Sequence, residues 1–578
     1  MKKWVFAPID EPLRDDISRR LDLSPITAAI LLARGITSVE AARSFLKPSL
    51  DDLIDPKLLP DMDRAVDTIC RHARDGSRIV IYGDYDVDGL CAVTMLLQFL
   101  RLAGLDPAYF VPERGEEGYG VHASVLKRLK AEGAGLVITV DCGVSSVEET
   151  RLAREMGLEM VITDHHEPSA ELPEAAALVN PKLNGSQYPF TELAGVGVAF
   201  KLVWALAERL SRGKKTDPHF RKFLLDSMAL VALGTIADVV PLLNENRIFA
   251  KFGLEALRCC ELPGVQALMS QCRLIDRALA ASDVSYKLGP KLNVAGRMES
   301  AEIAMRLLLT DSYGDGELIA RQLEELNHRR QAAQREIMET ARRKIEAEIS
   351  ENDYVLVLAE EDWPTGIIGI VASHIVEQYY RPTIMISLQE GFGRGSARSI
   401  PALNMVEALG AADEYLDGYG GHAQAAGVRI ATEHLENFRR KINAHAKTIL
   451  TPDDLKPRLD CDGEVLLDSL SHGFVNELAR LAPFGQSAAE PVLVSRGVRV
   501  AGRARRVGAA GKHLSCYVSQ GETSFRCIAF GMGEFAQRLP ANGGEFHIAY
   551  TPTVETYTGR GDIELRVKDI QIPGEDET

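Results

Sequence analysis

Short apolar runs rich in β-branched residues alternate with helix-length segments in the first half of the chain. Four runs have the length and composition of buried strands: residues 78–82, 135–140, 159–163 and 176–179. Strands that alternate with helices in this way predict an α/β fold with a doubly wound parallel sheet, here within residues 61–315. The runs at 354–358 and 383–388 restart the pattern, which predicts a smaller α/β domain over residues 351–450.

The two ends of the chain have different patterns. Helix signals at residues 26–34 and 38–45 predict a helical lead-in over residues 1–60, packed on the α/β domain that follows. Residues 456–578 carry short strand patterns separated by glycine turns, which predict a small barrel or sandwich. The predicted strands are 491–500, 512–519, 523–530, 545–557 and 562–572.

One long segment has neither glycine nor proline. Residues 317–349 are dense in Glu, Arg and Lys, with a narrow stripe of apolar positions at helical spacing. This pattern favours a long helix, over residues 316–350, that joins two domains. A surface helix of a single domain is the alternative.

The overall composition limits the choice of function. The chain has 578 residues, so roughly three or four domains are expected. Its net charge of −16 argues against a generally basic nucleic-acid binder, so a polyanionic substrate would need a local basic groove or a metal ion. The nine cysteines lack metal-finger spacing and no apolar stretch could span a bilayer, which together indicate a reduced, soluble, cytoplasmic protein with no membrane contact.

Carboxylates follow the first predicted strand directly. Asp84, Asp86 and Asp88 lie within five residues, just after the strand at 78–82. Three acids this close repel one another unless a divalent cation binds them, and parallel sheets place their sites at this edge. A solvated acidic turn is the alternative for this segment taken alone.

The next acids fall at equivalent places. Asp141 follows the strand at 135–140, and Asp164, His165 and His166 follow the strand at 159–163. A buried run at 228–233 predicts a helix that stops near Gly234, with Asp238 just beyond. Each Asp alone could be a helix cap. Together they favour a carboxylate and imidazole site for Mn²⁺ or Mg²⁺, and two ions about 4 Å apart would suit a phosphoryl hydrolase.

Two further regions carry groups suited to phosphate. In the smaller α/β domain, glycine turns stand beside serine, arginine and histidine in residues 393–399 and 420–427. The C-terminal region has a cluster of cations that would follow a phosphate backbone on a single-strand-binding barrel, or would be ordinary exposed charges on another barrel. They are Arg503, Arg505, Arg506, Lys512, Arg526, Arg560, Arg566 and Lys568.

At this point the motifs resemble a known family. GDYDVDG, TVDCG, TDHH and GTIADVVPL resemble the four motifs of the DHH phosphoesterase superfamily, and GSARS and GYGGHAQAAG resemble its associated substrate-binding domain. LAGVGVAFKL, GPKLNVAGRMES and the C-terminal barrel extend the likeness over nearly the whole chain. It is greatest to the superfamily's bacterial exonucleases specific for single-stranded DNA.

The resemblance implies roles for individual residues. Asp86, Asp141, His165 and His166 would be catalytic, with His166 facing the scissile phosphate. Arg297, Ser396 and Arg398 would grip a 5′ phosphate, while His422 and Arg114 would line the path of the strand. The implied ligands of two Mn²⁺ or Mg²⁺ ions are Asp84, Asp86, Asp88, Asp141, His165 and Asp238.

The implied activity is a 5′-to-3′ exonuclease that releases 5′ mononucleotides from single-stranded DNA in repair and recombination. An OB-fold barrel would feed the strand, and a helicase and a single-strand-binding protein would be partners of a monomeric enzyme. A DHH phosphodiesterase of short RNA or cyclic dinucleotides is one alternative, but such relatives generally lack the barrel. A non-catalytic DNA-binding scaffold is another, but such relatives lose metal carboxylates that this chain keeps.

Four residues, at three places in the chain, depart from the family pattern. Pro364 stands where a histidine is usual, His374 where an arginine is usual, and Ala488 and Ala489 where an Asn-Pro pair is usual. The metal motifs are intact, so the departures concern substrate grip and partner contacts.

Overall fold

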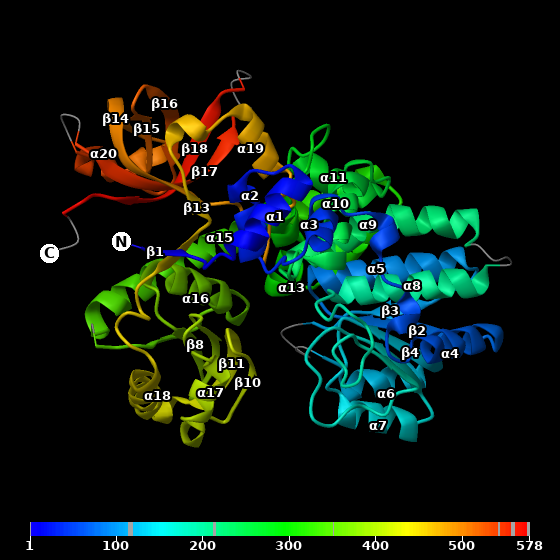
Figure 1. Cartoon of the computed structure of the whole chain (residues 1–578). Helices are drawn as coiled ribbons and strands as arrows, with labels where there is room; N and C mark the ends of the chain where they lie inside the picture. Colours follow the sequence, from blue (N-terminus) through cyan, green and yellow to red (C-terminus); the bar gives the residue numbers. More distant parts are fainter. Residues whose placement is uncertain are drawn as a thin grey trace.

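The computed structural model describes residues 2–113, 120–211, 216–350, 352–540, 544–555 and 561–574. Figure 1 shows a large α/β domain, a smaller α/β domain and a β-barrel, with the lead-in helices where the barrel approaches the large domain. Helix α15 (Tyr313–Glu348) joins the two α/β domains. Among the described helices, none combines the length and hydropathy that crossing a membrane would require.

The large domain is built on a parallel sheet, as predicted. Its strand order is β3-β2-β4-β5-β6. The strands are β2 (Arg78–Gly83), β3 (Ala108–Phe110), β4 (Ala134–Val140), β5 (Glu159–Thr163) and β6 (Ala177–Val179). Gly83 pairs with Val140, which pairs with Thr163, so three central strands end in one row. The residues that follow them therefore meet at one edge of the sheet.

Helices cover both faces of this sheet. One face packs on α5 (Val87–Leu102), α8 (Gly195–Leu210) and α9 (Pro218–Ala237) in a large apolar core, and the other on α6 (Ala123–Ala131) and α7 (Val147–Glu155). The expectation that a helix stops near Gly234 is wrong, because α9 continues to Ala237. Gly234 is instead a point of close contact with α5, where a side chain would collide with Asp88.

Helix α15 has the predicted role of a connection between domains. Ile319, Leu323 and Leu326 from its first half belong to the core of the large domain. Ile337 and Ala341 from its second half belong to a core with β7 (Leu356–Glu361), β8 (Thr383–Gln389) and α16 (Thr365–Tyr379). One helix thus contributes to two cores, which fixes the two domains relative to each other.

The smaller domain has a mixed five-stranded sheet of order β10-β11-β9-β8-β7. Its remaining strands are β9 (Phe392–Arg398), β10 (Gly418–His422) and β11 (Ala425–Ala431), and its remaining α-helices are α17 (Met405–Gly410) and α18 (Leu435–Ile449). The predicted phosphate-binding segments form β9 and the β10–β11 hairpin.

The C-terminal strands close into a barrel, as predicted. They are β14 (Leu493–Val507), β15 (His513–Gln520), β16 (Thr523–Ala529), β17 (Phe546–Val554) and β18 (Ile563–Gln571). The pairing of β14 with β17 closes the barrel, so neither strand is left as an open edge there.

The lead-in shares the core of the large domain and also contacts the C-terminal region, which was not predicted. Strand β1 (Lys3–Phe6) pairs in parallel with β12 (Arg458–Cys461), and the indole of Trp4 donates to Asp569 of the barrel at 2.8 Å. Helices α1 (Glu11–Leu21), α2 (Pro25–Ala33) and α3 (Val39–Leu46) follow. The hydroxyl of Ser24, the N-cap of α2, donates to Glu477 at 2.7 Å. The lead-in therefore bridges the large domain and the C-terminal region.

Candidate metal centre at the carboxyl edge of the sheet

All six predicted metal ligands, with His166, lie together at the edge where β2, β4 and β5 end. Their ligand atoms form three overlapping groups in which every atom lies within 4.8 Å of the others. The groups are Asp84, Asp86 and Asp141; Asp88, His165 and Asp238; and Asp141, His165 and His166. Six potential ligands exceed the needs of one ion, which suits a two-ion site.

The turns after β2 and β4 fix two of these carboxylates by backbone geometry. Asp86 is the N-cap of α5, and its Oδ1 accepts hydrogen bonds from the amides of Asp88 at 2.9 Å and Gly89 at 3.2 Å. Asp141 has a left-handed backbone with φ of 62°, a conformation uncommon outside glycine. Its buried carboxylate is thereby held in a strained turn at the strand end.

Asp88 is held from another element. Its two carboxylate oxygens accept from the amides of Gly195 at 2.6 Å and Val196 at 2.9 Å, the first residues of α8. A Cβ at Gly195 would lie 2.3 Å from Oδ1 of Asp141, and one at Gly234 would lie 2.6 Å from Oδ1 of Asp88. Two glycines thus make room for two carboxylates. The LAGVGVAFKL motif and Gly234 are the only sequence signals of these supports.

Asp164 orients both histidines of the TDHH motif. It is fully buried, and its Oδ1 accepts from the amide of His165 at 2.7 Å and lies 2.8 Å from Nδ1 of His166. Its Oδ2 accepts from the amide of Val144 at 2.9 Å. The carboxylate is thus used in positioning the imidazoles, in the manner of a carboxylate that orients a functional histidine.

Burial and crowding of like charges perturb the acids. Burial, with the charge of Asp86, raises the pKa of Asp88 to about 7. Burial and the charges of Asp88 and Asp86 raise the pKa values of Asp141 and Asp238 well above their usual range. Without a cation these carboxylates resist ionisation, whereas a shared cation would stabilise their charged forms. This behaviour is expected of an acidic metal site.

The two histidines are perturbed in opposite directions. Burial, with the neighbouring charge of His166, lowers the pKa of His165 to about 3, so its ring is neutral and can act as a ligand. Burial acts against the charged form of His166 as well, but the hydrogen bond and charge of Asp164 outweigh it and raise the pKa of that ring. His166 is therefore the group better suited to donate a proton or hydrogen bond.

The surroundings of Nε2 of His165 are those expected of a ligand atom beside a bound cation. Nε2 of His165 lies 3.2 Å from Oδ1 of Asp141, 3.7 Å from Oδ2 of Asp238 and 4.0 Å from Oδ2 of Asp88. Neither Nε2 of His165 nor Oδ1 of Asp141 makes a hydrogen bond within the described residues, although both atoms are buried. Buried polar atoms without partners are rare. The donor set and its geometry fit a divalent cation.

The residues predicted to bind a 5′ phosphate gather around the start of α16. Nη1 of Arg297 donates to the carbonyl of Gly366 at 3.3 Å, and Nη1 of Arg398 donates to Oγ of Ser396 at 3.0 Å. A Cβ at Gly369 would lie 2.9 Å from Oγ of Ser396. Arg297 from the large domain and the β9 residues from the smaller domain thus approach the same helix.

His422 lies farther from this group. His422 is exposed on β10, and the register places it opposite Ala425, which is itself opposite Arg398. Two strand spacings, about 10 Å, thus separate His422 from Arg398. Arg114 lies outside the described residues.

The barrel exposes aromatic and basic side chains. Tyr517 and Phe530 are 54% and 62% exposed, and Tyr517 lies opposite Arg526 in the β15–β16 pair. Arg526 also pairs with Glu564 at 3.5 Å. Arg560 of the predicted basic cluster lies outside the described residues. Exposed rings beside cations are the features with which barrels bind single strands.

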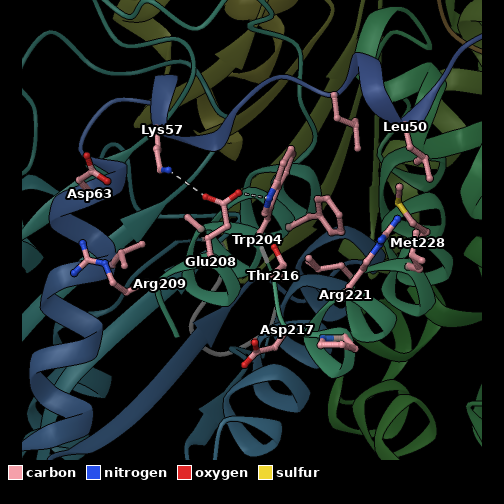
Figure 2. Close-up of a pocket in the computed structure, with 17 residues that line it drawn as sticks. Leu50, Lys57, Asp63, Trp204, Glu208, Arg209, Thr216, Asp217, Arg221 and Met228 are labelled. Carbon is pink, nitrogen blue, oxygen red and sulfur yellow. Dashed lines mark hydrogen bonds and ion pairs between the residues drawn. The ribbon is translucent and has the colours of Figure 1, made fainter. Parts of the chain in front are cut away.

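A cavity of about 1170 Å³ lies away from this edge, between the lead-in and the helices α8 and α9 (Figure 2). Its wall includes Trp204, whose indole donates to Glu208 at 2.9 Å, and Lys57 pairs with Glu208 at 3.2 Å. Its carboxylates include none of the grouped metal ligands. The cavity is therefore separate from the candidate catalytic site.

Family models match three parts of the chain, in the order in which the domains occur. Residues 78–235 match the DHH family, N-terminal domain, residues 352–448 match the DHHA1 domain, and residues 461–569 match the RecJ OB domain. The first of these contains most of the metal-ligand cluster. The chain is therefore a DHH-type phosphoesterase.

Similarity to individual known proteins identifies the family of this chain more closely. The single-stranded-DNA-specific exonuclease RecJ of Bacillus subtilis is 34% identical over 573 residues, covering 99% of this chain and 71% of the relative. The protein of the same name from Escherichia coli is 32% identical, covering 95% and 96%. The crystal structure of RecJ in complex with Mn²⁺ from Thermus thermophilus matches with a TM-score of 0.84 at 29% identity, covering 99% of this chain and 80% of the other. The chain belongs to the RecJ family.

Proposed function

We propose that this chain is a metal-dependent exonuclease that degrades single-stranded DNA from its 5′ end and releases 5′ mononucleotides. The observation that carries the proposal is the gathering of six carboxylate and imidazole ligands at one sheet edge, in a chain similar to RecJ exonucleases over 99% of its length. From the family resemblance we extend the proposal to a cytoplasmic monomer that acts in repair and recombination, with a helicase and a single-strand-binding protein as partners.

The ligands proposed for two Mn²⁺ or Mg²⁺ ions are Asp84, Asp86, Asp88, Asp141, His165 and Asp238. Bound ions would neutralise charge on the scissile phosphate and lower the pKa of the attacking water. The chain's own contribution is to hold this donor set in place before substrate arrives. The amides of Gly195 and Val196 orient Asp88, and the cap of α5 orients Asp86.

His166 is proposed to face the scissile phosphate. Asp164 fixes its ring at Nδ1 and raises its pKa, which favours a charged imidazolium directed toward an anionic substrate. A hydrogen bond to a phosphate oxygen would then be charge-assisted, and such bonds are about twice as strong as neutral ones.

Arg297, Ser396 and Arg398 are proposed to bind the terminal 5′ phosphate. Their convergence on the start of α16 supports this role, because the first amides of a helix have no intrahelical partner and attract anions. A phosphate fixed at this point would set the polarity of digestion. His422 and Arg114 are proposed to line the approach of the strand, and Tyr517, Phe530 and Arg526 to hold it on the barrel.

A strand labelled at either end tests this proposal. The full chain is incubated with a long 5′-phosphorylated single-stranded DNA and Mn²⁺, and with EDTA as the control. We expect early release of the 5′ label as mononucleotide, retention of the 3′ label on shortening products, and no reaction in EDTA.

Two other results would overturn it. An intact long strand beside rapid cleavage of a dinucleotide would indicate a phosphodiesterase of small substrates. Binding without cleavage of either substrate would indicate a scaffold.

A further inference from the structure

A polar groove lies between the two α/β domains, beside elements that carry the candidate metal centre. Two adjoining cavities of about 140 and 650 Å³ form it, and they share Pro290, Arg330 and Ile370 in their walls. Its walls come from α13 (Gly289–Met298), α15, α16 and the π-helical turn η3 (Val284–Leu288). Figure 1 shows α13 and α15 in the region where the domains meet. Single π-helical turns are frequent at functional sites.

The smaller cavity adjoins the candidate site. Ala237, in its wall, precedes Asp238, and Arg297 is one of the residues proposed to bind the 5′ phosphate. Asn293, also in the wall, accepts a hydrogen bond from the amide of Val87 at 3.0 Å, between Asp86 and Asp88. The inner end of the groove is therefore built on elements that also hold the metal-ligand cluster.

The larger cavity opens outward and has the volume of a small-molecule site, for which about 300–1,000 Å³ is usual. Tyr286, at its mouth, is 81% exposed. The departure from the family pattern at His374 also lies in this wall, where its Nδ1 is 2.8 Å from Nε2 of Gln334.

The lining of the groove is basic, in contrast to the net charge of the chain. Its charged residues are Arg273, Lys287, Lys291, Arg297, Arg330 and Glu324. Glu324 is already paired with Lys291 and lies 3.1 Å from His328, and Lys287 pairs with Asp283 at 2.8 Å. The groove lining therefore carries more positive than negative charge, which favours an anionic ligand.

Arg330 stands where the two cavities meet. Among the residues that the structure describes, this half-buried guanidinium donates only to neutral amide oxygens: to Oδ1 of Asn327 at 3.0 Å and to Oε1 of Gln334 at 3.1 Å. Within the described part of the chain, no carboxylate forms an ion pair with it. Burial lowers its pKa. An anion bound at this junction of the two cavities would stabilise the charge of the Arg330 guanidinium.

From this geometry we infer that the groove binds the nucleoside 5′-monophosphate released by hydrolysis, with Arg330 contacting its phosphate on the way out. The inference rests on the proposed function, because hydrolysis from the 5′ end leaves one dianionic mononucleotide at the inner end of the groove in each turnover. A strand held by the barrel and the metal centre obstructs the way the product came, so the product needs a second opening.

Binding of 5′-dAMP to the full chain tests the inference independently of hydrolysis. Isothermal titration in EDTA compares 5′-dAMP with deoxyadenosine for the wild type, Arg330→Gln and Arg335→Gln. Arg335 is the matched control, since it is exposed on the same helix, is outside the groove lining, and bonds the carbonyl of Gln331. We expect Arg330→Gln to weaken 5′-dAMP binding about tenfold, as for loss of one charge-assisted hydrogen bond. Deoxyadenosine binding and the Arg335→Gln protein should be unaffected.

Photolabelling locates the site and guards against an unfolded variant. With 8-azido-dAMP in EDTA, the label should fall on the peptide that contains Tyr286, and Arg330→Lys, which keeps the charge, should lose less affinity than Arg330→Gln. Equal affinity of wild type and Arg330→Gln for 5′-dAMP, or a label found only on residues 393–399, would overturn the inference. A chain that binds 5′-dAMP here but leaves single strands intact would instead contradict the proposed exonuclease activity.

Discussion

Oδ1 of Asp88 occupies the space that a side chain at Gly234 would fill. A Cβ at position 234 would lie 2.6 Å from that oxygen, closer than van der Waals contact allows, and 2.7 Å from Cγ1 of Val196. Helix α9 thus contacts the start of α5 at Asp88, whose carboxylate also accepts a hydrogen bond from the amide of Val196 in α8. The position of a predicted metal ligand depends on the absence of one methyl group.

Gly234→Ala should therefore impair hydrolysis although alanine favours helices by about 1 kcal/mol. Since Asp88 or Val196 must move, we expect kcat on a 5′-phosphorylated strand to fall at least about tenfold, or 1.4 kcal/mol in the barrier, with strand binding retained. Gly314→Ala is the matched control, because a Cβ there meets only Oγ of Ser312 at 3.9 Å. Full activity of Gly234→Ala would show that the position of Asp88 is not critical.

Asp86 has a structural role that must be separated from its proposed chemical one. Alanine removes both the negative charge and the cap of α5, a loss of about 1 kcal/mol, whereas asparagine can keep the cap. Both Asp86→Ala and Asp86→Asn should abolish hydrolysis and still bind single strands. Only the alanine variant should lose stability in urea unfolding. Near-normal turnover of Asp86→Asn would remove this carboxylate from the metal site.

Arg398→Ala should weaken the preference for a 5′-phosphorylated end. The lost charge-assisted bond is worth roughly 1.5–3 kcal/mol on a phosphorylated strand, and little on a strand with a 5′ hydroxyl. Initial rates on the two strands measure the difference. Arg394→Ala, on the same strand β9 and exposed, removes the same charge at a position that is not predicted to bind the phosphate, and should alter both rates alike. Equal losses on both ends in Arg398→Ala would refute its role.

The buried carboxylates predict that the effect of metal on stability depends on pH. Burial raises the folded-state pKa of Asp88 to about 7, above its value in the unfolded chain, so the metal-free protein should lose stability as pH rises from about 4 to about 7. Metal binding needs ionised ligands. Mn²⁺ should therefore raise Tm, relative to EDTA, more at pH 8 than at pH 5. An equal rise at the two pH values would contradict this account.

Arg247 connects three parts of the chain. Its buried guanidinium donates to the carbonyl of Phe45 in α3 at 2.7 Å and to those of residues 481–483, and it lies 3.6 Å from the ring centroid of Phe45. Arg247→Met leaves several buried carbonyl oxygens without donors, so the free energy of unfolding should fall by at least about 3 kcal/mol. Urea unfolding measures the change.

The control for this variant lies on the same helix, α10 (Asn244–Arg258). Arg258→Met removes a cation paired only at the surface with Glu255, at 3.1 Å, and should change stability by less than about 1 kcal/mol. Similar losses in the two variants would show that the contacts of Arg247 contribute little.

The sequence alone was sufficient for β2, β4, β5 and β6 and for the edge at which the acids meet, whereas the short edge strand β3 was not predicted. Apolar runs mark β2, β4 and β5, and in a parallel sheet the residues that follow the strands converge whatever the rest of the chain does. The sequence also indicated α15 and the C-terminal strands, because both follow from periodicity and turn residues that act over short distances. That these strands form a closed barrel and not a sandwich was implied by the family resemblance.

Only the tertiary structure decided how these parts support one another. Gly234 looked like a helix stop, because a glycine that clears space for a distant carboxylate has no local signature. The pairing of β1 with β12, and the contact of Arg247 with residues 481–483, join segments more than 230 positions apart. Such contacts depend on which packed surfaces meet, and hydrophobic periodicity specifies that a surface is buried but not what buries it.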